Sequence, residues 1–276
     1  MPIELVCPII IVAWALMLTL LERRFPYIPG YKVFRREFWN DLLVYTLAQS
    51  YVLALVIAFI IRMIDSGTGL SRLELVSDWP IGLQLLFFLV THDLWQYWFH
   101  RLQHSNRVMW RTHEAAHAPL HVDWLSGSRS HALEILIAQS VEFAPIILLG
   151  AAPEVAVLKA CSDSIWGMFN HSNIRVRMGV LLYVFNGPEL HRWHHELGAP
   201  AGGCNFSTKF AVWDWIWGTA YYPAPGAVPV GRYGLKRSEE FPHGNYWKQF
   251  LYAFRRKSRE RGKAADKENT AVEHMY

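Results

Sequence analysis

The chain has 276 residues, of which 52% are hydrophobic and only 18% are charged, and its formal net charge is +4. Soluble domains carry about 25% charged residues, so this composition favours a membrane protein over a soluble one. The basic residues form no block interleaved with aromatic residues, which argues against nucleic acid as a partner. The three cysteines, Cys7, Cys161 and Cys204, form no CxxC motif and predict neither a disulfide framework nor a zinc ribbon.

Five apolar runs predict an all-α integral membrane protein. The first, residues 6–21, lacks a basic segment before it and a small-residue cleavage site, so we interpret it as a retained anchor. The second, 42–64, and the third, 80–100, are long enough to span a bilayer. The fourth covers 132–152, and a weaker fifth, 154–169, would return against it as a hairpin. We therefore expect four to five transmembrane or hairpin helices.

Basic residues predict the orientation of these helices. The loop after the first run and the segment after the third are rich in arginine, whereas the loop between the second and third contains only Arg72. The positive-inside rule places the two basic segments, and the tail beyond Arg255, on the cytoplasmic side. The sequence does not distinguish a bacterial inner membrane from the endoplasmic reticulum.

Thirteen histidines are the unusual feature of the composition. Most of them fall in spaced groups, in which intervals of three or four residues put the side chains on one face of a helix. The groups contain seven histidines: His100 and His104, then His113 and His117, then His191, His194 and His195. We expect the groups to form a histidine-rich helical cap on the cytoplasmic side.

Seven imidazoles on one face are difficult to explain by packing alone. Buried histidines need partners, and neighbouring ones repel if they are protonated. A metal ion binds them in the neutral form, and imidazole suits iron, zinc and copper. Because one ion takes four to six ligands, two ions sharing the set is the simplest interpretation.

The region from Asp93 to Tyr222 resembles the fatty acid hydroxylase / sterol desaturase superfamily, which are integral-membrane di-iron oxygenases. The resemblance rests on ordered motifs: D-L-W-Q-Y-W-F-H-R-L-Q-H, W-R-T-H, D-W-L-S-G-S-R-S-H-A-L-E, F-N-H-S-N-I, P-E-L-H-R-W-H-H-E and N-F-S-T-K-F-A-V-W-D-W-I-W-G-T. It implies two non-haem iron ions, with zinc as a possible substitute, and the following ligands: His100, His104, His113, His117, His171, His191, His194 and His195.

The resemblance also implies a division of the chain into three parts. Residues 1–80 would be N-terminal membrane anchor helices, and residues 81–222 would be the histidine-box di-metal catalytic domain. Residues 223–276 would be a C-terminal cytoplasmic segment with a basic tail.

The second histidine box departs from the family pattern. It normally reads HxxHH, whereas here the fourth position is Ala116. His121 or Glu114 could supply the missing ligand; alternatively, the second metal is weak or absent.

Four further features have predicted roles. His131 is expected to hydrogen-bond Glu134 rather than to touch metal. Asp93 is expected to pair with a ligand histidine or an arginine. His92 is left open between such a role and contact with neighbouring helices. The motif W-D-W-I-W-G-T, residues 213–219, favours a membrane-interface belt over a substrate pocket.

The function implied by the resemblance is O2-dependent hydroxylation of an unactivated C–H bond in a lipid or another hydrophobic substrate. Desaturation on the same scaffold is the alternative. No nucleotide, flavin or haem motif is present, so electrons would come from a separate reductase, ferredoxin or cytochrome.

Two interpretations from other classes remain open. A zinc-dependent membrane hydrolase could use Glu114 or Glu196 as a base, although no HExxH motif is present. A haem or metal carrier is the other, but clustered histidines suit a bis-histidine haem poorly.

Overall fold

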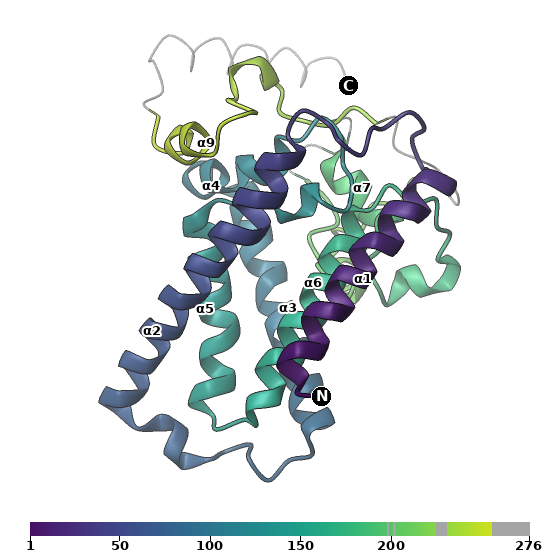
Figure 1. Cartoon of the computed structure of the whole chain (residues 1–276). Helices are drawn as coiled ribbons and strands as arrows, with labels where there is room; N and C mark the ends of the chain where they lie inside the picture. Colours follow the sequence, from purple (N-terminus) through teal and green to yellow (C-terminus); the bar gives the residue numbers. More distant parts are fainter. Residues whose placement is uncertain (198, 201–202, 225–230, 256–276) are drawn as a thin grey trace.

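The computed structural model describes residues 1–197, 199–200, 203–224 and 231–255. The regular elements among the described residues are all helices, and the one extended pairing among these residues is an isolated bridge between Pro26 and Ile174. Long helices run beside one another in a bundle (Figure 1). They are α1 (Ile3–Arg24), α2 (Ser50–Thr68), α3 (Ile81–Ser105), α5 (Ala132–Leu148) and α6 (Pro153–His171). The all-α prediction is therefore confirmed.

Short helices gather at one end of this bundle (Figure 1). They are α4 (Arg107–His117), α7 (Pro188–His195) and α9 (Tyr246–Tyr252). The other elements are the π-helical segment η1 (Asn40–Gln49), which leads into α2, the helix α8 (Val212–Ile216) and the 3-10 turns η2 (Leu70–Leu73), η3 (Ser126–Ser128), η4 (Gly179–Tyr183) and η5 (Ser238–Glu240). The end that carries α4, α7 and α9 is called the cap below.

Local signals in the sequence set several helix ends. The Asn106 side chain accepts hydrogen bonds from the backbone amides of Val108 and Met109, at 2.9 and 3.1 Å, and so caps the first turn of α4. Pro153 begins α6, where its missing N–H costs nothing. Gly69 ends α2 with a φ of 67°, a left-handed conformation that glycine adopts without strain.

Two stretches are long and apolar enough to cross a membrane: Ile3–Arg24, and Asn40–Thr68, which joins η1 to α2. Each exposes rows of apolar side chains, which are Leu5, Ile9, Val12, Leu16 and Leu20 in the first and Leu43, Leu47, Tyr51, Leu55 and Phe59 in the second. Exposed apolar rows of this length fit a lipid environment. Of the four to five predicted spans, these two are long and apolar enough to cross a membrane.

The remaining long helices accompany the two candidate spans but are more polar. The helix α5 has only 17 residues, and α3, α5 and α6 share a buried ionic cluster of His92, Glu142, Lys159 and Asp163, which Lys209 joins from a loop. The Lys159 ammonium lies 2.6 Å from a carboxylate oxygen of each acid and 3.1 Å from the ring of His92. His92 therefore contacts the neighbouring helices. The side chains of His92, Glu142 and Asp163 could otherwise hold a metal ion, but the Lys159 ammonium already lies among them.

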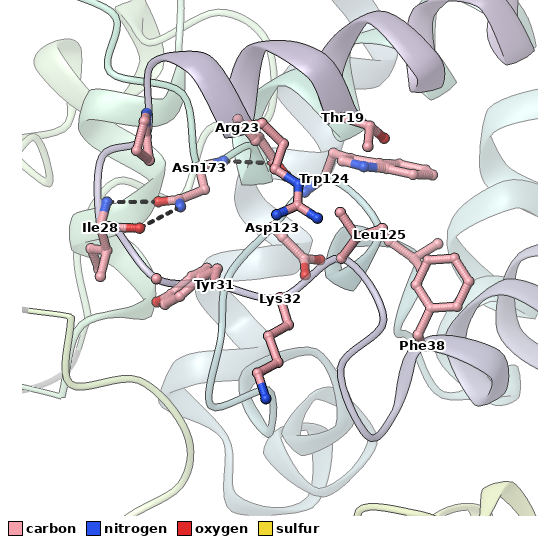
Figure 2. Close-up of a pocket in the computed structure, with 14 residues that line it drawn as sticks. Thr19, Arg23, Ile28, Tyr31, Lys32, Phe38, Asp123, Trp124, Leu125 and Asn173 are labelled. Atoms are coloured by element: carbon pink, nitrogen blue, oxygen red, sulfur yellow. Dashed lines mark hydrogen bonds between the residues drawn. The ribbon is translucent and has the colours of Figure 1, made fainter.

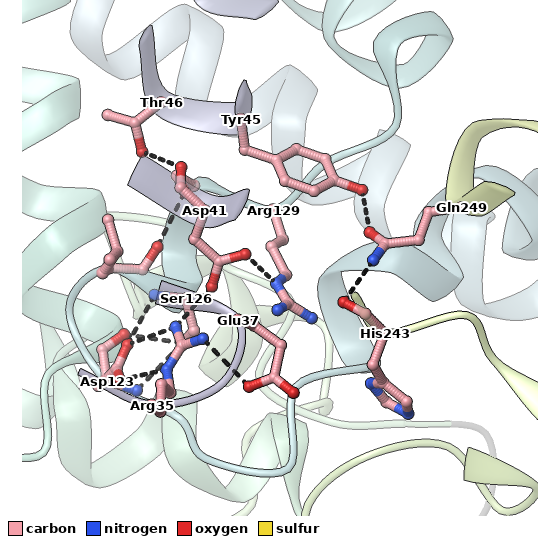
Figure 3. A network of polar contacts seen from close by, with 12 residues as sticks. Arg35, Glu37, Asp41, Tyr45, Thr46, Asp123, Ser126, Arg129, His243 and Gln249 are labelled. Atoms are coloured by element: carbon pink, nitrogen blue, oxygen red, sulfur yellow. Dashed lines mark hydrogen bonds and ion pairs between the residues drawn. The ribbon is translucent and has the colours of Figure 1, made fainter. Parts of the chain in front are cut away.

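A second ionic network ties the loops of the cap together (Figure 3). Arg35, from the loop after α1, lies 2.7 Å from Asp123 and 2.6 Å from Asp41. Arg129 reaches the other oxygen of Asp41 at 2.5 Å, with both side chains buried. Buried ions are tolerated only when they are paired, so this network holds the loops before η1 and before α5 in one arrangement.

Residues 231–255 pack against the rest of the cap. Arg255 binds the carboxylate of Glu114 in α4 through two contacts, at 2.7 and 2.9 Å. The side chain of Gln249 in α9 accepts a hydrogen bond of 2.5 Å from Tyr45 in η1. The predicted basic tail beyond Arg255 lies outside the described residues.

We predict that Lys159→Met lowers the free energy of unfolding by about 3–5 kcal/mol, because the buried carboxylate of Glu142 loses its cation, whereas Asp163 keeps Lys209. The measurement is denaturant unfolding of the purified protein in detergent. Lys248→Met, at an exposed lysine of α9, is the control and should change stability by no more than about 0.5 kcal/mol. Equal stability of both variants would show that the buried cluster contributes nothing.

Candidate metal centre

The structure brings all eight predicted histidines to the cap. His100 and His104 end α3, and His113 and His117 lie one turn apart in α4. His171 ends α6, and α7 contributes the remaining three, His191, His194 and His195. Helix spacing places each set on one face, but only the bundle brings the four helices to one point.

The ring nitrogens form two groups, in each of which they lie within 4.8 Å of one another. The first group contains His100, His104, His113, His117 and His194, and the second contains His171, His191 and His195. The groups touch, because the rings of His117 and His195 are 4.5 Å apart. This arrangement can hold two metal ions side by side.

The outer nitrogens of four of the eight rings are tied to acceptors, one of them His171, whose Nδ1 atom lies 2.9 Å from the Gly167 carbonyl oxygen. The Nδ1 atom of His100 lies 2.7 Å from the Phe206 carbonyl oxygen, and that of His194 lies 2.7 Å from the Cys204 carbonyl. The Nδ1 atom of His113 lies 2.9 Å from the Glu134 carboxylate. Such partners fix the tautomer with the proton on Nδ1, which leaves the Nε2 lone pair free for a metal.

The inner Nε2 atoms face one another. Where both rings carry their proton on Nδ1, neither Nε2 atom can donate a hydrogen bond to the other. The Nε2 atoms of His100 and His113 are 3.0 Å apart, although both rings donate from Nδ1. In the second group, His191 Nε2 lies 2.9 Å from His171 Nε2 and 3.1 Å from that of His195. The buried Nε2 of His104 has no hydrogen-bond partner. Converging lone pairs of this kind fit a cation, so the donor set is suited to metal ions.

Burial keeps the imidazoles neutral. Desolvation, reinforced by the neighbouring histidines, lowers the pKa of His117, His191, His194 and His195 well below the usual value of 6.5. Neutral imidazole is the form that binds metal, so at neutral pH no proton competes for these sites.

Two aspartates hold the loop whose carbonyls support the rings. Asp214 accepts hydrogen bonds of 2.8 Å from the backbone amides of Phe206 and Ser207. Asp93, on α3, accepts from the amides of Lys209 and Phe210 at 2.9 and 3.0 Å. The loop is thereby anchored at both ends of the segment that follows Phe206.

Comparison with known proteins gives the family. The fatty acid hydroxylase family model matches residues 85–219, the region that contains all eight histidines. A very-long-chain aldehyde decarbonylase, GL1-9, of Oryza sativa subsp. indica is 31% identical over 63% of this chain and 67% of its own length. The chain belongs to the fatty acid hydroxylase superfamily.

Other relatives in the superfamily are named as lipid hydroxylases or monooxygenases. The ornithine lipid hydroxylase OlsE of Rhizobium tropici is 28% identical over 78% of this chain and 67% of its own length. The alkylglycerol monooxygenase of Homo sapiens is 26% identical over 46% of this chain but only 28% of its own length. No solved structure gives a significant match.

Two expectations about residues near the eight clustered histidines were wrong. Asp93 pairs with neither a histidine nor an arginine, because backbone amides, Thr208 and the Trp213 indole occupy its carboxylate. His131 does not bind Glu134: its Nδ1 caps the backbone amide of Leu133 in α5, and its Nε2 lies 3.0 Å from the Phe250 carbonyl. Glu134 instead supports His113, a role that the sequence did not indicate.

The residues considered as substitutes at Ala116 lie elsewhere. The ring of His121 packs edge-on against Tyr31, with 4.5 Å between ring centroids. The carboxylate of Glu114 is occupied by Arg255. Neither residue belongs to a metal-competent group, so the second group has three imidazoles where the first has five.

Sequence reasoning also missed a glycine. A Cβ atom at Gly127 would lie 2.7 Å from the Nδ1 atom of His171 and 3.2 Å from the Gly167 carbonyl. Only glycine lets η3 approach the ring this closely. A glycine at a contact between a 3-10 turn and a distant helix carries no distinguishing pattern in a single sequence.

The tryptophan-rich motif packs inward as well as outward. The ring of Trp217 stacks on Tyr97 in α3, with 5.0 Å between centroids, and the Trp215 indole donates to the Leu182 carbonyl. Ile216 is exposed. The motif therefore contributes mainly to holding α8 and Asp214 in place.

Glu134→Gln is expected to weaken metal binding about 10- to 100-fold, because an outer partner of a ligand imidazole loses its charge. Competitive titration with a chelator measures this affinity. Glu154→Gln, at an exposed acid that starts α6, is the matched control. Unchanged affinity in Glu134→Gln would contradict the role given to the carboxylate.

The metal-free protein should lose stability as the pH falls below about 6.5. Unfolded histidines take up protons there, whereas the buried ones, whose pKa is lowered, cannot. The stability is fully present above pH 6.5, and each such histidine costs up to about 1.4 kcal/mol per pH unit below it. Melting temperatures at pH 7.5 and 5.5 test this. The variant His121→Gln should keep the same pH dependence, whereas a flat profile in the unmodified protein would contradict the prediction.

Proposed function

We propose that the chain is a membrane-bound di-iron oxygenase that hydroxylates an unactivated C–H bond of a lipid. The observation that carries this proposal is the convergence of eight buried imidazoles in two adjacent groups. The group around His194 would hold one iron and the group of His171, His191 and His195 the other. Zinc, which also accepts imidazole ligands, is the possible substitute.

Two non-haem irons would supply the reduction of O2 and the attack on the C–H bond, which side chains cannot perform. The reaction would consume the substrate, O2, two electrons and two protons, and would yield an alcohol and water. The chain would keep the imidazoles neutral and oriented, and would exclude bulk water. Electrons would come from a separate reductase, ferredoxin or cytochrome.

The relatives support hydroxylation of a lipid. Two of them are named a lipid hydroxylase and an alkylglycerol monooxygenase, so we prefer oxygen insertion to desaturation. A zinc hydrolase is less well supported, because both carboxylates considered as its base are occupied: Glu114 binds Arg255, and Glu196 accepts the backbone amides of Gly231 and Arg232.

We further propose that the protein crosses the membrane several times with its cap in the cytoplasm. The loop after α1, which carries Lys32, Arg35 and Arg36, lies at the same end as the histidines (Figure 1). The positive-inside rule supports this orientation.

Elemental analysis of the protein purified in detergent tests the metal proposal. We expect about two irons per chain, the number that eight nitrogen ligands can satisfy, and loss of iron in His194→Ala but not in His121→Ala. One iron per chain would mean that Ala116 has cost the second site. Zinc in place of iron would contradict the oxygenase.

Isotope labelling tests the reaction itself. Incubation with labelled O2, an electron donor and membrane lipid extract should place the label in a lipid hydroxyl group. Label that entered from water instead would contradict oxygen insertion.

A further inference from the structure

A cavity of about 260 Å³ lies beside the cap, at the end of α1 (Figure 2). Its walls come from the last turn of α1, the loop that follows it, residues 123–125 and Asn173. If the first candidate span crosses the membrane, the cavity at its end would lie at the depth of lipid headgroups. Pockets for whole ligands usually have about 300–1,000 Å³, so this cavity suits a headgroup rather than an entire lipid.

The cavity is lined by one partly buried acid, Glu22, and by two basic residues that are exposed to solvent, Arg23 and Lys32. The Glu22 carboxylate accepts the backbone amides of Trp124 and Asn173, at 2.9 and 2.8 Å. Among the described residues, no ion pair joins Glu22 to a cation, and none occupies Arg23 or Lys32. Figure 2 shows the Arg23 guanidinium reaching into the cavity and Lys32 at its edge.

The remaining acid of the cavity is already neutralised. Arg35 binds both oxygens of Asp123, at 2.7 and 3.1 Å. Glu22 is therefore the group available to an incoming ammonium, and Arg23 with Lys32 the groups available to an incoming anion. The Asn173 side chain donates to the Ile28 carbonyl at 2.8 Å and accepts from the Ile28 amide at 3.0 Å, and these bonds hold the walls in position.

The cavity shares its walls with the metal centre. Asn173 follows His171 by two residues, and η3, next to Leu125, contacts the ring of His171. Arg192, beside His191, donates to the carbonyl oxygens of Val122 and Ser172 at 2.9 and 3.3 Å. Each of these carbonyls precedes a residue that lines the cavity, so one guanidinium joins the metal-bearing α7 to both loops.

We infer that this cavity binds the zwitterionic headgroup of the lipid substrate, with an ammonium on Glu22 and a carboxylate or phosphate on Arg23 and Lys32. The inference rests on the proposed function for the role of the lipid as substrate. Binding at this position would hold the lipid next to the second histidine group, separated from it by the residues that form the shared wall. A neutral or purely anionic lipid would leave Glu22 without its partner.

Calorimetric titration of the metal-free full chain in maltoside detergent tests the recognition. The probes are Nα-dodecanoyl-lysine, Nα-dodecanoyl-norleucine, which lacks only the ammonium, and dodecylphosphoethanolamine, whose anion is a phosphate. We expect both zwitterions to bind about tenfold more tightly than the norleucine amphiphile, the value of one charge-assisted contact. Nα-acetyl-lysine, which has no chain, should bind more weakly than either, because a free amino acid lacks the apolar anchor.

Three variants assign the contacts. Glu22→Gln keeps an acceptor for the two backbone amides and should abolish the preference for the zwitterions. Arg23→Gln should weaken all three amphiphiles about tenfold. Arg24→Gln is the matched control, because this neighbouring arginine is exposed and lies over the Phe25 ring, outside the cavity.

Several results would overturn the inference. These are absence of binding, equal affinity for the lysine and norleucine amphiphiles, a preference that survives Glu22→Gln, or an effect of Arg24→Gln as large as that of Arg23→Gln. Oxidation measured separately distinguishes the two proposals. Binding without lipid oxidation would contradict the proposed function alone, whereas lipid oxidation with unchanged KM in Glu22→Gln and Arg23→Gln would contradict the headgroup site alone.

Discussion

The candidate metal centre depends on hydrogen bonds at the outer nitrogens of its histidines. Backbone carbonyls of Phe206 and Cys204 and the carboxylate of Glu134 hold the Nδ1 atoms of three rings. Each contact places the proton on the outside of the ring and the lone pair on the inside. Without these contacts, buried imidazoles would pair with one another through alternate tautomers and would offer fewer free lone pairs.

The supporting carbonyls require a fixed loop, and carboxylates provide it. Asp93 and Asp214 each accept hydrogen bonds from two backbone amides of the segment 206–210. A carboxylate that receives several amide donors remains buried at acceptable cost. This explains why a chain with few charged residues places so many of them inside: they position backbone rather than react.

Buried charged residues also hold other parts of the chain in place, in the helix bundle and beside the cap. Lys159 is buried between Glu142 and Asp163, and Arg35 lies between Asp41 and Asp123. Both networks join helices or loops that are distant in sequence. In contrast to these paired charges, the partly buried Glu22 of the cavity has no ion-pair partner among the described residues, and this is the reason to expect a cationic group of a ligand there.

The sequence by itself determined the helical class, the family and the eight histidines that meet at the cap. The helical class and seven of the histidines follow from local regularities, which are apolar runs of helical length and intervals of three and four residues that place side chains on one helix face. The family and His171 follow from the resemblance of the ordered motifs. The candidate spans were only partly predictable, because α3, α5 and α6 combine apolar length with buried ionic groups.

Only the tertiary structure decided how the histidines divide into groups of five and three, and which residues support them. Glu134 lies 21 positions from His113, and the Phe206 carbonyl lies 106 positions from His100. A backbone carbonyl has the same chemistry at every residue, so no pattern in the sequence marks the one that will face an imidazole. The roles expected for Asp93 and His131 were wrong for the same reason: their partners are backbone groups brought near by the packing of distant segments.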